Sequence, residues 1–288
     1  MNDRVAIVSI KRMGRSPLRS DSDQDLVAVE APVLVELHQA ARSGSRSLGV
    51  LMRTPGDDRD LILGLLYTEG MIRSIDDVLA VEARSGVAAT SGGEAERPAD
   101  EVIDVHLADD VELDAGATDR ALLSTSACGL CGRLAVRGLD VLVGRALARD
   151  RPTLLSATVA GLPAALRKGQ AVFEATGGLH AAGLFDATGQ LLAIREDVGR
   201  HNAVDKLVGA ALAAGWLPAR DAVLAVSGRV AFEIVQKTVM AGVPALVAVG
   251  APSSLAVDAA RAANLTLIGF VRDGRFNVYS GIERIDLR

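Results

Sequence analysis

Three short and almost continuous apolar segments follow one another in the last third of the chain: Ala222–Val226, Pro244–Val249 and Leu265–Phe270. The two intervals between them are long enough for a helix and have helical periodicity. Strands that are apolar on both faces and alternate with helices are typical of a parallel sheet covered on both sides. The pattern therefore predicts an α/β fold with crossover helices in this part of the chain.

The residues before these segments predict a hairpin and further helices. His180–Phe185 and Gln190–Ile194 are apolar runs joined by Asp186-Ala-Thr-Gly189, a sequence typical of a glycine turn. Helical periodicity predicts helices over about residues 161–175 and 200–214. One more helix is predicted after the second apolar segment, with Ser253 or Ser254 as its N-cap.

The sequence pattern from about residue 18 to residue 123 indicates a smaller α+β domain. Alternating apolar and polar residues predict strands over residues 27–37, 47–53 and 101–107. Helical periodicity after a Pro-Gly turn predicts one helix over residues 57–69. The residues before Leu18 are polar and basic and predict a loose arm. The stretch Arg84–Asp100 has almost no large apolar side chain and predicts a disordered insertion.

Composition and charge exclude several classes of protein. Hydrophobic residues make up 49% of the 288, enough to bury a sizeable core, and the formal net charge of −5 argues against a general nucleic-acid binder. The amino terminus has too short an apolar run for a signal peptide, and no run is long enough to cross a bilayer. We therefore expect a cytoplasmic protein with no membrane or nucleic-acid partner.

Cys128 and Cys131 are the only cysteines, and glycines follow both of them in the stretch Ser124–Arg133. Uncovered backbone amides and the nearby Arg133 would stabilise a thiolate there, which favours a nucleophilic role for sulfur over a structural one. Dithiol redox chemistry, half of a zinc site and an inert pair are the alternatives. Zinc needs two more ligands, and no paired metal spacing occurs among the four histidines, His38, His106, His180 and His201.

Glycines and charged residues gather where the predicted strands end, which is the place where open α/β sheets bind ligands. Three such stretches predict one cleft with phosphate-binding amides and guanidinium groups. Ordinary turn chemistry with surface ion pairs is the alternative for each stretch taken alone. The candidate residues are Gly177, Gly178, His180, Arg200, His201, Asn202, Ser227 and Arg229.

The last predicted hairpin, Phe270–Tyr279, places Arg272 and Arg275 beside Phe270 and Phe276. An aromatic base stacked on phenylalanine with its phosphates on arginine fits this composition. The alternative is a terminal hairpin whose phenylalanines belong to the core.

These motifs resemble those of the formate dehydrogenase accessory sulfurtransferases, the FdhD family, and the resemblance covers most of the chain. The stretch Glu196-Asp-Val-Gly-Arg-His-Asn202 is its most specific element, whereas a Cys-x-x-Cys pair alone is not specific. The other matching elements are Arg53–Asp57, Glu69-Gly70, Ser126–Gly132, Thr176–Ala182, Ser227–Arg229 and Arg275–Tyr279.

The resemblance implies a sulfurtransferase that takes persulfide sulfur from a cysteine desulfurase. It implies transfer of that sulfur to the cofactor molybdenum bis(molybdopterin guanine dinucleotide) before a formate dehydrogenase receives it. The persulfide cysteine maps onto Cys128, with Cys131 as its partner. Cofactor binding maps onto Phe270, Val271, Arg272, Asp273, Gly274 and Arg275. A non-catalytic carrier of the molybdenum cofactor is the alternative function.

The resemblance also implies an architecture and an assembly. Residues 151–288 would form a three-layer α/β/α domain similar to cytidine deaminases, joined to the smaller domain by a mobile connector at 124–150, and the protein would be a homodimer. The zinc chemistry of deaminases is not expected, because Ala127 precedes Cys128 where the deaminase motif has proline and no His-x-Glu element occurs. We therefore expect no resident metal.

Overall fold

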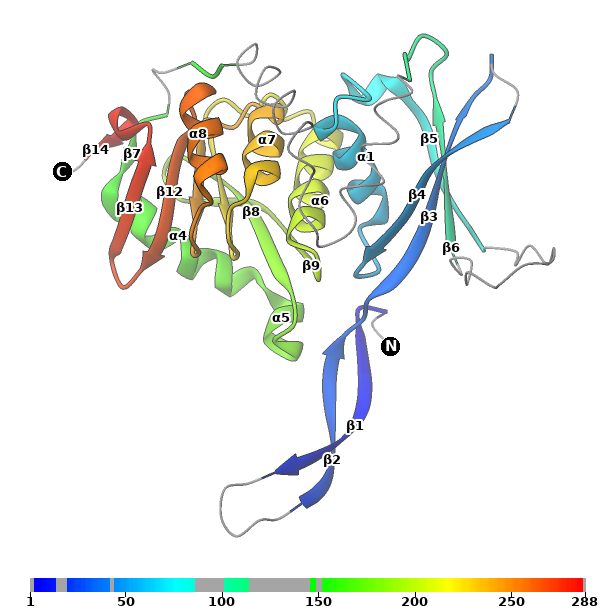
Figure 1. The fold of residues 1–288 in the computed structure, drawn as a ribbon, viewed down its shortest axis with the longest axis horizontal. Helices are drawn as coiled ribbons and strands as arrows, with labels where there is room; N and C mark the ends of the chain where they lie inside the picture. Colours follow the sequence, from blue (N-terminus) through cyan, green and yellow to red (C-terminus); the bar gives the residue numbers. More distant parts are fainter. Residues whose placement is uncertain are drawn as a thin grey trace.

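The computed structural model describes residues 3–13, 20–41, 44–85, 101–113, 146–148 and 152–286. The larger sheet has six strands in the order β13-β12-β11-β10-β8-β9 (Figure 1). The three apolar segments form its parallel centre, as predicted, while the hairpin strands β8 and β9 and the last strand β13 pair antiparallel to their neighbours. The sheet is thus mixed rather than all parallel, because tight turns reverse the chain at both edges. Its strands are β8 His180–Asp186, β9 Leu191–Asp197, β10 Ala222–Val226, β11 Ala245–Ala248, β12 Thr266–Arg272 and β13 Arg275–Ser280.

Helices cover both faces of the larger sheet, so this part of the chain has three layers. In β10, Val223 and Ala225 pack in the core under α4, whereas Leu224 and Val226 pack in the core on the opposite face. Burial of both faces explains why the strands are apolar at every position. The helices are α4 Ser156–Gly169 on one face and α6 Arg200–Ala213, α7 Phe232–Met240 and α8 Ser254–Ala262 on the other.

The single helix predicted over residues 161–175 is wrong in detail, because two helices occupy this range. The break lies at Gln170, and α5 Ala171–Thr176 follows it. The carboxylate of Glu196 accepts hydrogen bonds from the amides of Val172 and Phe173, at 3.0 and 2.8 Å. A carboxylate on strand β9 therefore caps the start of α5 and fixes the break.

The smaller sheet has the order β4-β3-β6-β5, and α1 packs on one of its faces. Its inward side chains, such as Val35 and Val105, are fully buried against Ile62 and Leu66 of the helix. Arg84 and Ser85 belong to β5 rather than to a disordered insertion, and residues 86–100 lie outside the described residues. The elements are β3 Ala31–Gln39, β4 Ser45–Arg53, α1 Asp58–Thr68, the 3₁₀ turn η1 Ile75–Asp77, β5 Val78–Ser85 and β6 Glu101–Leu107.

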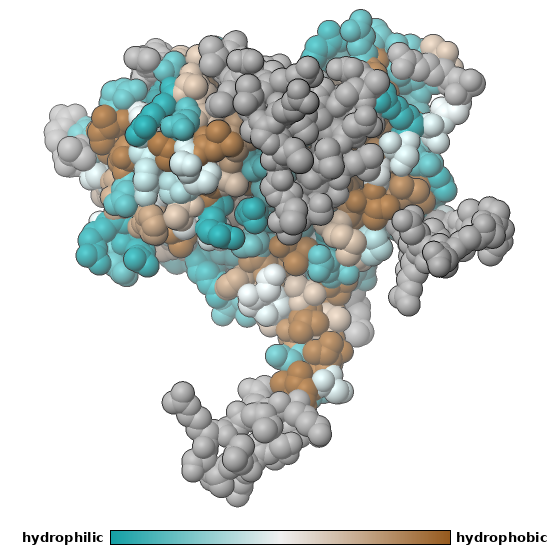
Figure 2. Space-filling model, viewed as in Figure 1, coloured by the Kyte–Doolittle hydropathy of each residue, from teal (hydrophilic) through white to brown (hydrophobic). Residues whose placement is uncertain are grey.

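The predicted loose arm is instead an antiparallel ribbon of β1 Val5–Met13 and β2 Ser20–Ala28 that projects from the body of the molecule (Figure 1). Apolar side chains line the part of the ribbon nearest the body (Figure 2), and Ile7 and Leu26, opposite each other in register, are exposed. Near the C-terminus, the 3₁₀ turn η2 Ile282–Arg284 leads into β14 Ile285–Asp286. This short strand pairs with β7 Leu154–Leu155, which precedes α4.

The two sheets are joined by the crossing of α1 and α6, which lie side by side in Figure 1. A Cβ on Gly64 would lie 1.8 Å from the carbonyl oxygen of Asp205, and a Cβ on Gly209 would lie 1.9 Å from that of Asp60. Only glycine fits at either position, so the backbones of the two helices touch directly. Among the helices of the described ranges, none combines the length and hydropathy required to span a membrane.

Candidate functional site

The carboxyl ends of β10, β11 and β12 lie at one edge of the larger sheet, together with the end of β9 and the start of β8. This is the lower edge of the sheet in Figure 1. We call the residues 197–202, 227–231, 249–253 and 270–275, with His180, the ligand edge. The predicted binding residues from four separate stretches of sequence meet here, as strand topology requires.

The first turn of α6 supplies Arg200 and His201, and a buried carboxylate fixes its position. Asp197 is fully buried and accepts hydrogen bonds from the Gly199 amide at 2.8 Å and from Asn202 Nδ2 at 3.0 Å. Asn202 Nδ2 also donates to the Met52 carbonyl at 2.8 Å. Both amide hydrogens of this predicted cofactor ligand are therefore used within the protein, and Asn202 holds the turn in place.

Thr54, the residue after β4 of the smaller sheet, is hydrogen-bonded to this turn. Lys206 Nζ forms an ion pair with Asp197 at 2.8 Å and donates to the Thr54 carbonyl at 2.7 Å. The Thr54 amide donates to Asp197 at 3.1 Å, and its hydroxyl accepts from the Val198 amide at 3.1 Å. The end of β4 and the start of α6 thus form one buried network. Local sequence spacing could not reveal this network, since Thr54 is 143 to 152 residues from its partners.

His180, Gly228 and Arg200 converge at the centre of the ligand edge. A Cβ on Gly228 would lie 3.2 Å from His180 Nδ1 and 3.9 Å from Arg200 Cβ. Desolvation by burial lowers the pKa of His180 below its usual 6.5, and the positive charges of Arg200 and Arg229 lower it further, against the opposing effect of Asp197. The imidazole is therefore neutral at pH 7 and can both donate and accept a hydrogen bond.

His201 is more strongly perturbed than His180. Burial lowers its pKa to about 3, with further contributions from the charges of Arg200, Lys237 and His180. Its Nε2 and the Nε of Arg200 are buried and lack a hydrogen-bond partner in the described part of the chain, and Glu233 Oε2 lies 4.0 Å from Nε2. Buried polar atoms without partners are rare in native proteins, so these two atoms are candidate hydrogen-bonding partners for a ligand.

Backbone hydrogen bonds connect the residues that follow β10 and β11 to one another and to Phe270 of β12. The Gly250 amide donates to the Gly228 carbonyl at 3.2 Å, and the Phe270 amide donates to the Gly250 carbonyl at 3.2 Å. Gly250, which the sequence analysis did not select, ends an apolar strand just as Gly228 does. Ser227 is used internally, since its hydroxyl accepts from the Ala181 amide at 2.9 Å, while Arg229 is exposed.

The backbone is irregular from Phe270 to Arg275, which covers the end of β12 and the turn into β13. Phe270 has a φ of 56°, in the left-handed region that aromatic residues rarely adopt, and its side chain is 37% exposed. Strain of this kind is concentrated at functional sites. Val271 points inward and is buried, while the guanidinium-bearing residues Arg272 and Arg275 face each other in register and are exposed. Asp273 and Gly274 form the turn, with φ values of 52° and 72°.

The remaining predicted site residues fall into two groups. Gly177 ends α5 in the left-handed conformation, with a φ of 67°, and the Cβ position of Gly178 lies 3.4 Å from Ala28 Cβ at the base of the ribbon. Both are exposed and stand just before β8. Cys128 and Cys131 lie outside the described residues.

The arrangement suits an extended anionic ligand. Arg200, Arg229, Arg272 and Arg275 supply positive charge to one edge of a protein whose net charge is −5. Guanidinium groups and backbone amides at a helix start bind phosphates, and an exposed Phe270 offers a stacking face. Neutral histidines add hydrogen bonds without adding charge.

Comparison with known proteins gives a consistent result. The FdhD/NarQ family model matches residues 28–286. A protein from Nocardia farcinica named "Sulfur carrier protein FdhD" is 49% identical over 91% of this chain and 88% of its own length. Proteins of the same name from Streptomyces avermitilis and Sulfurisphaera tokodaii are 44% and 38% identical, over 92% and 96% of this chain and 90% and 100% of their own lengths.

The fold is also found in a solved structure. A crystal structure described as that of a candidate formate dehydrogenase accessory protein from Desulfotalea psychrophila has a TM-score of 0.70 and 22% identity, covering 98% of this chain and 99% of that one. The two chains therefore share one mixed α/β fold. The chain belongs to the FdhD/NarQ family, as the sequence motifs predicted.

The low pKa of His201 predicts a pH-dependent stability. The unfolded chain takes up a proton near pH 6.5 while the folded chain does so only near pH 3, so stability is lost as the pH falls through this window. At pH 5 the loss is about 2 kcal/mol, at 1.4 kcal/mol for each pKa unit. Urea unfolding at pH 7 and pH 5 should show a smaller drop for His201→Gln than for the wild type. Equal drops would contradict the assignment.

Proposed function

We propose that this chain is a sulfur carrier that accepts persulfide sulfur on Cys128 from a cysteine desulfurase. It passes the sulfur to the molybdenum bis(molybdopterin guanine dinucleotide) cofactor, its cargo, before a formate dehydrogenase receives that cofactor. One observation carries the proposal: full-length relatives such as the one from Nocardia farcinica, 49% identical, are named sulfur carrier proteins. Cys128 and Cys131 are the only thiols on which this chain can carry sulfur.

The first chemical step is a thiolate attack on the donor persulfide. The Cys128 thiolate bonds to the outer sulfur, the sulfur–sulfur bond of the donor breaks, and the donor cysteine leaves as a thiolate. Cys128 now carries the persulfide. The step conserves electrons, because one sulfur–sulfur bond replaces another.

The second step releases the sulfur toward the cargo. Attack by the Cys131 thiolate on the inner sulfur of Cys128 forms a Cys128–Cys131 disulfide and expels hydrosulfide, which becomes a ligand of molybdenum. The two thiols supply the two electrons that reduce the sulfur, and a cytosolic dithiol then reduces the disulfide. If Cys131 only stabilises the thiolate, an external thiol takes its place in this step.

The ligand edge is the proposed docking site for the guanine dinucleotide part of the cargo. The exposed guanidinium groups of Arg229, Arg272 and Arg275 pair with phosphates, and the exposed ring of Phe270 stacks on the base. The unpaired Nε of Arg200 and Nε2 of His201 give the ligand two hydrogen-bonding groups. A chain that only carries and protects the cofactor would use the same edge without the thiol chemistry.

We infer that the three-layer part of the chain is a cytidine deaminase-like domain, in which the catalytic zinc site has been replaced by a cargo site. We also infer that the chain acts as a homodimer in the cytoplasm.

Cys128→Ala tests the sulfur step. Incubation of the wild-type chain with a cysteine desulfurase and cysteine should add the mass of one sulfur atom to the peptide that contains Cys128, as measured by mass spectrometry. Cys128→Ala should lose both this adduct and the activation of formate dehydrogenase. Cys131→Ala should keep the adduct. Full dehydrogenase activation by Cys128→Ala would overturn the sulfur step and favour the non-catalytic carrier.

Arg229→Ala tests the ligand edge independently of the thiols. Calorimetry with GDP should show binding to the wild type and at least tenfold weaker binding to Arg229→Ala, since each lost charge-assisted contact is worth about 1.5–3 kcal/mol. Arg261→Ala is the matched control, because Arg261 is an exposed arginine near the end of α8. Cys128→Ala should bind GDP normally. Equal GDP affinity in both arginine variants would contradict the site.

A further inference from the structure

The face of the smaller sheet that points away from α1 carries a group of polar side chains that the proposed function does not use. Strands β3 and β6 run parallel and in register, with Glu36 opposite Asp104 and His38 opposite His106. Side chains two residues apart on a strand share a face, so these four form a square array. The sequence could not show it, because the pairs are 68 residues apart.

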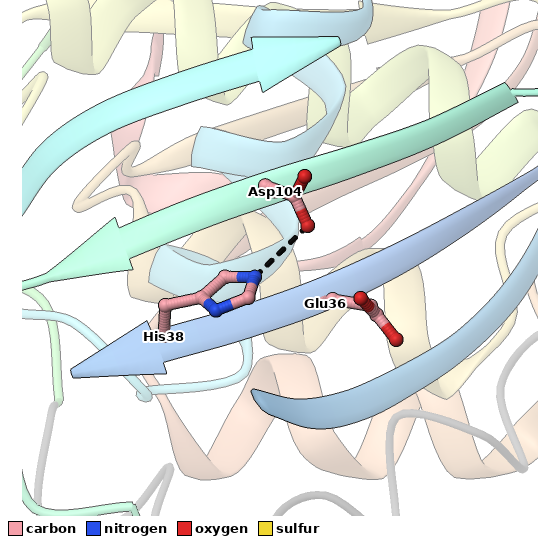
Figure 3. Close-up of side chains that lie close together, drawn as sticks. All are labelled: Glu36, His38 and Asp104. Atoms are coloured by element: carbon pink, nitrogen blue, oxygen red, sulfur yellow. Dashed lines mark hydrogen bonds and ion pairs between the residues drawn. The ribbon is translucent and has the colours of Figure 1, made fainter. Parts of the chain in front are cut away.

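Three of these residues place atoms that can bind a metal ion close to one another. Nε2 of His38 and Oδ1 of Asp104 are 2.9 Å apart, and one ligand atom each from Glu36, His38 and Asp104 lie within 4.8 Å of one another (Figure 3). Donors bound to a common ion at about 2.0–2.2 Å are about 3.5 Å apart in a tetrahedral site. A movement of about 1 Å, which side-chain rotation provides, closes the difference.

The positive charge at this point comes from Arg84 of β5. Its Nε donates to Asp104 Oδ2 at 2.5 Å, and its terminal nitrogen donates to Glu36 Oε2 at 2.9 Å. The guanidinium thus balances the two carboxylates that a metal ion would use. Its side chain is 47% exposed, and exposed ion pairs contribute little to stability because solvent screens them, so a metal ion can displace it.

The stacked ring of His106 orients the imidazole ligand. The His38 and His106 rings lie 5.0 Å apart between centroids with an interplanar angle of 21°. In the metal-free chain, this stacking and the hydrogen bond to Asp104 hold His38 in one orientation.

We propose that Glu36, His38 and Asp104 form a binding site for a divalent transition-metal ion of the Zn²⁺ class, with Arg84 as a built-in competing cation. One imidazole and two carboxylates match the ligands of Zn²⁺, whereas Mg²⁺ and Ca²⁺ prefer oxygen alone. Three protein ligands leave one position of a tetrahedral ion open to water. The site is separate from the ligand edge, and it does not depend on sulfur transfer.

Calorimetry with ZnCl₂ on the metal-free, full-length chain tests the proposal. The measurements use a Cys128→Ser/Cys131→Ser background, because cysteine thiolates bind zinc themselves. This background should bind one equivalent of Zn²⁺, and His38→Gln and Glu36→Gln should each weaken binding at least tenfold. Arg84→Ala should tighten binding at least threefold, because it removes the competing charge.

Arg73→Ala is the matched control for the charge change. Arg73 is an exposed arginine that pairs with Asp77 and Asp110, outside the site, so its removal should leave the zinc affinity unchanged. Thermal unfolding of each variant checks that it is folded. No zinc binding in either the background or Arg84→Ala overturns the proposal. Equal affinity in the background, His38→Gln and Glu36→Gln also overturns it.

Discussion

The direct contact between α1 and α6 is the constraint on which the rest of the structure depends. Gly64 and Gly209 let the two helix backbones touch, because a methyl group at either position would overlap a carbonyl oxygen of the other helix. This close approach places the end of β4 beside the first turn of α6. Since that turn bears Arg200 and His201, the packing of the smaller sheet sets the geometry of the ligand edge.

Two buried ion pairs stabilise this arrangement. Asp197 pairs with Lys206 and is tied to Thr54, while Asp205 pairs with Lys237 at 2.8 Å. The hydroxyl of Thr68 in α1 donates to the Asp205 carboxylate at 2.8 Å and accepts from Lys237 Nζ at 3.0 Å. Burying such pairs stabilises little in total, but breaking one costs about 3–5 kcal/mol. Through Thr54 and Thr68, both networks connect the smaller sheet and α1 to the larger part of the chain.

The sequence predicts the larger sheet well because both of its faces are buried. The apolar segments, the β8–β9 hairpin and α6 all have strong periodic or turn signals, and the ligand edge follows from strand order alone. The ribbon of β1 and β2 was missed because two strands without a second layer bury little, so their composition resembles that of a flexible arm. The break between α4 and α5 depends on Glu196, whose contact with α5 only the tertiary fold creates. Similarly, the grouping of Glu36 with Asp104 depends on strand register, which no local spacing reveals.

Hydrogen–deuterium exchange of residues 197–206 in Gly64→Ala, compared with Gly161→Ala, tests most directly whether the helix contact holds the ligand edge. A Cβ on Gly161, on the exposed side of α4, meets no atom within 4 Å, so this variant controls for a glycine-to-alanine change inside a helix. We expect faster exchange at 197–206 in Gly64→Ala, because overpacking forces α1 and α6 apart, and wild-type protection in Gly161→Ala. Unchanged protection at 197–206 in a folded Gly64→Ala chain would contradict the account.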